Sequence, residues 1–138
     1  MTLYHLDFYR WTQEAAAALR EQRLSAADAE KVADEIESMG KRDFRELSSR
    51  LERILEHKLK LSYLPAWTVD RNQRLWLDSI DKQQTGIRKL LNDSPSLRAC
   101  VEPLISESYN DAARRIRRLF PGVELPVHCP WTVQEVLE

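Results

Sequence analysis

Hydrophobic residues recur at steps of three and four along almost the whole chain of 138 residues. This spacing places them on one face of an α-helix, whereas a half-buried β-strand alternates every second residue. The chain contains only 3 Gly, which is few for a fold built from tight β-turns. The sequence therefore predicts an all-α helical bundle of about four main helices, and its length suits a single domain, 1–138.

The longest predicted helix runs from about Ala26 to about Leu64. Its start carries a capping-box pattern, Ser25 followed by Asp28, and Pro65 stops it. Gly40 lies inside this stretch and either ends the helix or bends it. Because no polar loop separates the residues on its two sides, we favour one long bent or staggered helix.

Helix caps and prolines locate the other elements. The first helix of the chain is predicted to follow Asp7, and the helix after the long one is predicted to start at Asp70, after a short connection. A short helix is predicted at Pro95, and a long one from Pro103.

The C-terminal tail, 123–130, should be extended and irregular because it carries two prolines. Thr132 and Glu135 form a last capping box. Val127 and Trp131 are apolar enough to pin this tail onto the bundle.

Neither a secretory signal nor a membrane-spanning stretch is visible in the sequence. Cys100 and Cys129 lack CxxC spacing, so two reduced thiols are favoured over a disulfide. These features predict a soluble cytoplasmic protein.

Motifs for metal, cofactor and nucleotide binding are absent from the sequence, so no metal, cofactor or catalytic residue is assigned. The residues three before each His are not acidic, which excludes the Glu-x-x-His pairs of di-iron bundles. No glycine-rich phosphate loop is present. An enzyme remains the weakest alternative, with His57 as a base beside carboxylates.

The net charge of −1 hides a strong segregation of charge along the chain. An acidic run occupies 28–37, basic residues predominate over 41–60, and four arginines cluster over 114–118. Opposite charges of this kind select partners and fix their orientation. The candidate interaction surface comprises Asp34, Glu35, Glu37, Trp67, Arg42, Arg45, Arg114, Arg115 and Arg118.

Several short motifs together resemble a bacterial family, domain of unknown function 29. They are the segments 7–11, 32–40, 79–80, 87–91, 93–97 and 129–137, in that order. The resemblance implies a small all-helical protein and assigns no activity, cofactor or catalytic residue.

Three functions are therefore weighed. The favoured one is a protein-interaction or regulatory module that binds a protein partner or itself, with an exposed apolar patch beside the acidic run as its mark. The alternatives are a nucleic-acid-associated protein that uses the basic helix faces and, last, the enzyme with a His57 site.

Overall fold

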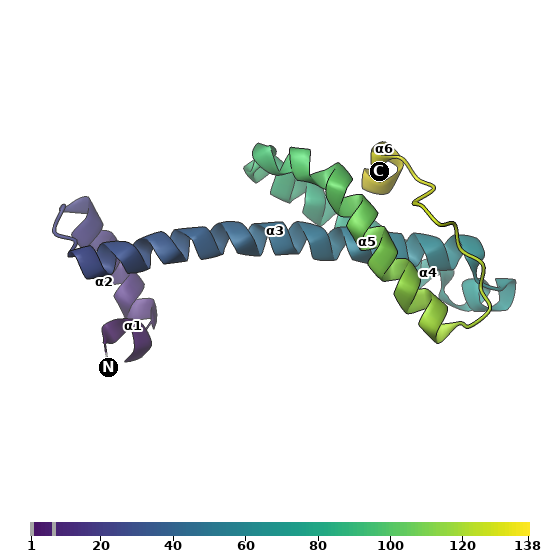
Figure 1. Cartoon of the computed structure of the whole chain (residues 1–138), viewed down its shortest axis with the longest axis horizontal. Coiled ribbons are helices and arrows are strands. Elements are labelled where there is room, and N and C mark those ends of the chain that lie inside the picture. Colours follow the sequence, from purple (N-terminus) through teal and green to yellow (C-terminus); the bar gives the residue numbers. More distant parts are fainter. Residues whose placement is uncertain (1, 7) are drawn as a thin grey trace. The chain divides into compact units, whose positions relative to one another are not determined.

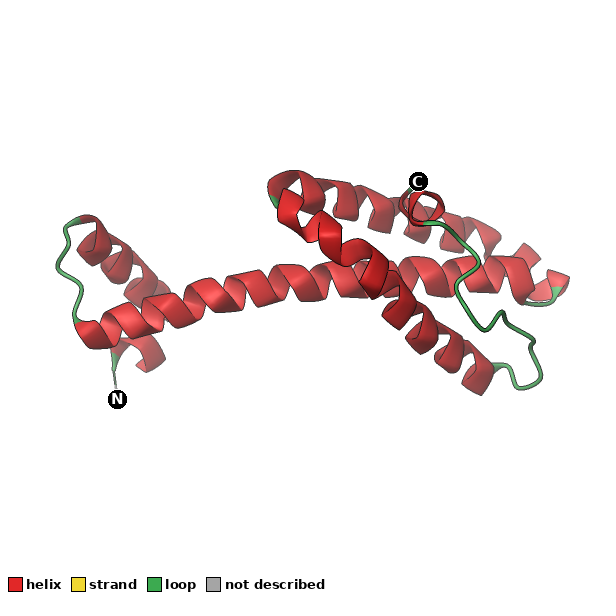
Figure 2. Ribbon diagram, turned by 45° about the horizontal axis from the view of Figure 1, so that its top comes forward, coloured by secondary structure: helices red, strands yellow, loops and turns green. Residues whose placement is uncertain are grey.

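The computed structural model of the chain describes residues 2–6 and 8–138, and the side chains of 2–6 and 13–138. The predicted cap Asp7 lies outside the described residues. The described part is helical with no strand, which confirms the all-α fold (Figures 1 and 2). The chain divides into two compact units, Met1–Arg42 and Asp43–Glu138, called unit 1 and unit 2, which are described separately. The single domain over 1–138 stays a prediction.

Unit 1 contains α1 (Leu3–Leu6), α2 (Phe8–Arg20) and the start of α3 (Ala26–Tyr63). α2 ends where Gln22 adopts a φ of 57°, and the Arg23 N–H then donates to the Ala18 carbonyl at 2.8 Å. α3 begins behind Ser25, as predicted, because the Ser25 hydroxyl accepts from the Asp28 N–H at 3.1 Å. Among the described side chains of unit 1, Ala15 is the only buried hydrophobic one.

α3 continues through Gly40 without a break, so the predicted long helix is confirmed. A Cβ built on Gly40 would meet nothing within 4 Å, so no neighbour fills the space there.

Unit 2 is built around one cluster of buried side chains from four helices. It contains the second part of α3, α4 (Ala66–Asp93), the 3-10 turn η1 (Pro95–Leu97), α5 (Arg98–Leu119) and α6 (Val133–Leu137). α3, α4 and α5 supply nearly all of the core, and α6 adds Val136. The tail returns along the bundle and brings α6 against α4 and α5 (Figure 2).

Two predicted helix starts are wrong. α4 begins at Ala66 instead of Asp70, because the Pro65 carbonyl accepts from the N–H groups of Thr68 and Val69 at 3.0 and 3.1 Å. α5 runs through Pro103 without a new start. The missing N–H of a proline removes one helical hydrogen bond, and the buried side chains on both sides of Pro103 hold the helix against the core.

Three contacts fix the C-terminal tail. The Tyr109 hydroxyl donates to the Pro126 carbonyl at 2.5 Å, and Gln84 Nε2 donates to the Val136 carbonyl at 3.1 Å. The predicted capping box of Thr132 and Glu135 is present. Val127, predicted to pin the tail, does not do so because it is 76% exposed.

Half-buried Trp131 does pack against the core cluster, and the Lys58 ammonium lies 5.3 Å from its ring centroid.

The α6 cap gives a testable prediction. We expect Thr132→Ala to lower the free energy of unfolding of the full chain by about 1 kcal/mol, because the Glu135 N–H loses its acceptor. Thr132→Ser keeps the hydroxyl and should remain close to the wild type. Urea unfolding followed by circular dichroism measures both, and equal losses for the two variants would contradict the cap.

Candidate functional site

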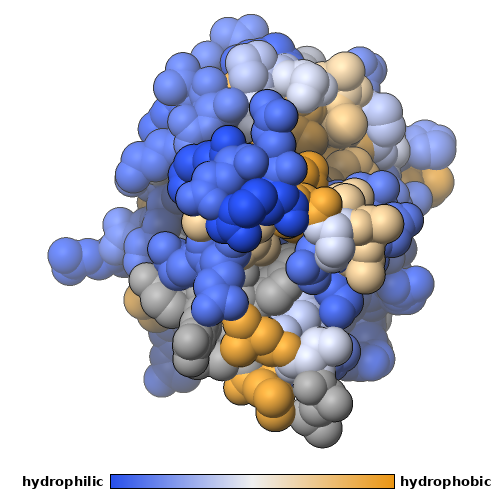
Figure 3. All heavy atoms as spheres, turned by 90° about the vertical axis from the view of Figure 1, so that its left-hand side faces the viewer, coloured by the Kyte–Doolittle hydropathy of each residue, from blue (hydrophilic) through white to orange (hydrophobic). Residues whose placement is uncertain are grey.

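An apolar stripe on α3 is exposed in unit 1. Val32 is half-buried, whereas Ile36 is 61% and Met39 58% exposed. These three residues are spaced four and three apart, so they share one helix face. We call Val32, Ile36 and Met39 the α3 stripe. Figure 3 shows hydrophobic patches (orange) between hydrophilic residues (blue) on the face that it views.

Carboxylates flank the α3 stripe. Asp34 and Glu37 are exposed and Glu35 is half-buried. The Tyr4 hydroxyl donates to Glu35 Oε1 at 2.5 Å, and the Lys31 ammonium lies 5.4 Å from the centroid of the Tyr4 ring. The hydrogen bond to Glu35, followed by burial and the negative charges of Glu35 and Asp34, raises the pKa of Tyr4 above 10.0. Tyr4 is therefore a protonated donor at neutral pH and ties α1 to the acidic run.

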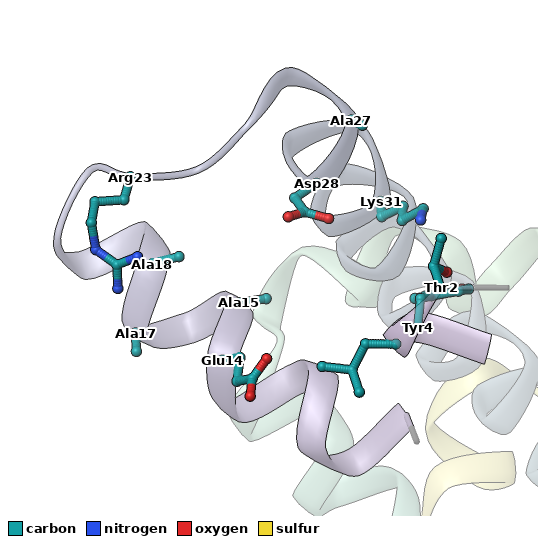
Figure 4. A pocket seen from close by; sticks show the side chains of 11 residues that line it. Thr2, Tyr4, Glu14, Ala15, Ala17, Ala18, Arg23, Ala27, Asp28 and Lys31 are labelled. Atoms are coloured by element: carbon teal, nitrogen blue, oxygen red, sulfur yellow. The ribbon is translucent and has the colours of Figure 1, made fainter. Parts of the chain in front are cut away.

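A cavity of about 560 Å³ lies beside this cluster, within unit 1 (Figure 4). Small side chains of α2 and α3 leave the space, and Glu14, Arg23, Asp28 and Lys31 contribute charges of both signs to its lining. Arg23 already pairs with Glu21. A lining with mixed charge selects neither anions nor cations, so the cavity alone indicates no ligand class.

Two of the four arginines in the α5 cluster, in unit 2, form ion pairs. Arg115 donates to Glu52 at 2.8 Å and to Glu56 at 3.0 Å, which joins α5 to α3. Arg114 pairs with Asp111 at 2.9 Å.

Arg118, in the last turn of α5, is exposed. The structure thus uses two of the three predicted α5 arginines in ion pairs within unit 2, which leaves less positive charge for a nucleic acid.

The remaining predicted surface residues are exposed. Arg42 lies on α3 in unit 1, and Arg45 lies on α3 in unit 2. Trp67, predicted at the surface, is 66% exposed in the first turn of α4.

His57 packs against an aromatic ring instead of a carboxylate. Its ring stacks on Trp76 with centroids 6.4 Å apart and an interplanar angle of 22°. Its Nδ1 is buried and has no hydrogen-bond partner within the described part of the chain. The neighbouring Glu56 carboxylate accepts from Arg115 and pairs with Lys60 at 3.2 Å. No described hydrogen bond therefore joins His57 to a carboxylate as an acid–base pair.

Burial lowers the pKa of His57 below its ordinary 6.5. The positive charges of Lys60 and Arg53 lower it further, and Glu56 opposes them. His57 is thus neutral in the folded protein at neutral pH.

Arg50 pairs with Glu46 on α3 at 3.8 Å, and its contact with α4 was not predicted from the sequence. A Cβ built on Gly86 of α4 would lie 2.4 Å from Arg50 Cζ and Nη1. Arg50 Nη1 donates to Gln83 Oε1 at 2.9 Å. This close approach explains why a glycine occurs inside α4.

The two cysteines are free thiols. Burial raises the pKa of Cys129, and its thiol donates to the Trp131 carbonyl. Among the described residues, no group of three or more His, Cys, Asp or Glu side chains could hold a metal ion. In the same part of the chain, no helix has the length and hydrophobicity required to span a bilayer.

The Arg50–Gly86 contact predicts a change of sign between two backgrounds. In the wild type, Gly86→Ala should lower the free energy of unfolding by about 1 kcal/mol net, because the displaced guanidinium loses its hydrogen bond to Gln83, which contributes about 2 kcal/mol, while helix propensity returns about 1 kcal/mol. In an Arg50→Ala background the same change should raise it by up to about 1 kcal/mol, through helix propensity alone. Urea unfolding of the four proteins measures the cycle, and one sign in both backgrounds would contradict the contact.

The lowered pKa of His57 predicts a loss of stability on acidification. Between about pH 7.5 and pH 5.5 the unfolded chain binds a proton at His57 more readily than the folded chain. The free energy of unfolding should therefore fall as the pH falls through this window. His57→Gln should flatten the profile, and urea unfolding at each pH compares the two proteins. Parallel profiles would show that His57 does not titrate differently in the folded state.

Comparison with known proteins gives one match. The family model described as domain of unknown function DUF29 matches residues 3–138, essentially the whole chain. The curated proteins contain no match to the chain, and neither do the solved structures.

Proposed function

This chain belongs to the DUF29 family, and we propose that it is a protein-interaction module whose contact surface is the α3 stripe with its flanking carboxylates. The exposure of Ile36 and Met39 carries the proposal. Apolar side chains at helical spacing are normally covered by another element, and here they lie beside Glu35 and Glu37. Protein–protein interfaces commonly have an apolar centre surrounded by a polar or charged rim.

The small number of buried hydrophobic residues among the described side chains of unit 1 supports the same conclusion. A unit of about 40 residues rarely buries enough apolar surface to be stable alone, and Ala15 is the only buried hydrophobic among its described side chains. Burial of Ile36 and Met39 by a partner would add apolar contact to this unit.

The alternative functions receive less support. Arg114 and Arg115 are paired with carboxylates, which weakens the case for a nucleic-acid surface on α5. His57 lacks a hydrogen-bonded carboxylate among the described residues, and no observation favours catalysis.

Affinity capture with the tagged full chain, from cells that naturally produce it, tests the interaction module. A parallel sample is treated with nuclease. We expect nuclease-resistant protein partners that Ile36→Asp/Met39→Asp loses, because a buried carboxylate without a partner is strongly disfavoured.

The matched control is Leu75→Asp/Val127→Asp, which changes two exposed apolar residues of unit 2 and should retain the partners. Partners that disappear on nuclease treatment would favour the nucleic-acid alternative. Partners lost equally from both double variants would contradict the α3 stripe.

A further inference from the structure

The charges of α3 in unit 1 change sign along the helix. Carboxylates predominate in its first three turns, where Lys31 is the one base, and the unit ends with Lys41 and Arg42. Two such segments side by side in parallel would place acid against acid. In the antiparallel arrangement the acidic part of each copy faces the basic end of the other, which is attractive.

We infer that the α3 stripe binds a second copy of the same chain, with the two α3 segments antiparallel. The inference rests on the proposed function, since it names the partner of the same surface. A two-fold axis makes the contact self-complementary, so that each pair of residues occurs twice. All the residues that it uses lie in unit 1.

The apolar pair sets the register of the two helices. When Ile36 of one copy packs on Met39 of the other, the two-fold axis passes between residues 37 and 38. Both side chains are more than half exposed in the single chain. Their burial against each other removes apolar surface from water, which is the main favourable term of association.

The two edges of the stripe agree with this register. Glu35 and Arg42 are seven residues apart, which is two helical turns, so both lie along one edge. In the antiparallel dimer Glu35 of each copy lies beside Arg42 of the other, with opposite charges. The Tyr4 hydroxyl holds the Glu35 carboxylate from the same copy.

Ala33 and Gly40 are also seven residues apart and lie along the other edge. Ala33 is exposed, and the place of a Cβ on Gly40 is open for at least 4 Å. Small residues facing each other allow two helix axes to approach closely, because the spacing depends on the side chains at the contact.

Sedimentation equilibrium of the full chain tests self-association. Because the contact covers only a few turns, we expect a monomer–dimer equilibrium with a dissociation constant of about 100 µM. Ile36→Asp should abolish the dimer. Added salt should weaken it, since the charges are close to solvent. A dimer that survives Ile36→Asp would overturn the surface.

A charge exchange tests the antiparallel register. In the Glu35→Lys dimer, two positive charges meet at each of the two contacts between positions 35 and 42, and in the Arg42→Glu dimer two negative charges meet there. Each variant should therefore weaken association about tenfold. An equimolar mixture of the two variants contains only opposite charges at both pairs, and it should dimerise about as tightly as the wild type.

Glu37→Lys makes the same charge change at an exposed neighbour outside the proposed pairs, so it should weaken association less than threefold. If Glu37→Lys weakens association as much as Glu35→Lys does, or if the mixture stays weak, the register is wrong.

The two proposals fail separately. A chain that stays monomeric at all concentrations, but captures nuclease-resistant partners through the α3 stripe, overturns the second copy and leaves the interaction module standing. A monomeric chain whose captured partners do not depend on Ile36 and Met39 overturns both.

Discussion

Unit 2 depends on a row of apolar side chains along one face of α3. Each member is fully buried, and α4, α5 and α6 contribute to the same core. A buried Leu or Ile stabilises the fold by about 1.5–3 kcal/mol relative to its exposed form. The burial of this row is therefore the main contribution of α3 to the stability of unit 2. The members of the row are Leu47, Leu51, Ile54, Leu55 and Leu59. The polar links, such as Arg115 to Glu52 and Glu56, lie at the edge of this core and orient helices that are already packed.

Local sequence signals located most of the helices. The hydroxyl caps at Ser25 and Thr132 act within a few residues, so the sequence shows both partners of each contact. Two helix starts were nevertheless predicted wrongly. The Asp70 pattern looked like a helix start, but the Pro65 carbonyl already accepts from the Thr68 and Val69 N–H groups, so α4 begins at Ala66. Similarly, a proline reads as a boundary, whereas burial on both sides of Pro103 keeps α5 in one piece.

The candidate site was predictable in its charges but not in their partners. The sequence indicated an acidic run and an arginine cluster, and both are present. It could not show that Arg115 reaches carboxylates about 60 residues earlier, because such pairs form only once α3 and α5 pack. Nor could it show that Arg50 packs against Gly86, whose missing Cβ makes room for the guanidinium.

Helical periodicity shows that a face of a helix will be covered, but not by what. The same spacing runs through α3 in both units: in unit 2 the residues are buried by their own chain, while in unit 1 Ile36 and Met39 are exposed. A second property must decide what covers Ile36 and Met39. That property is the order of acidic and basic residues along α3. Apolar contact has no direction, so it would accept either orientation of a second α3. The order of charge disfavours the parallel one, because it sets the acidic turns of one copy level with the acidic turns of the other.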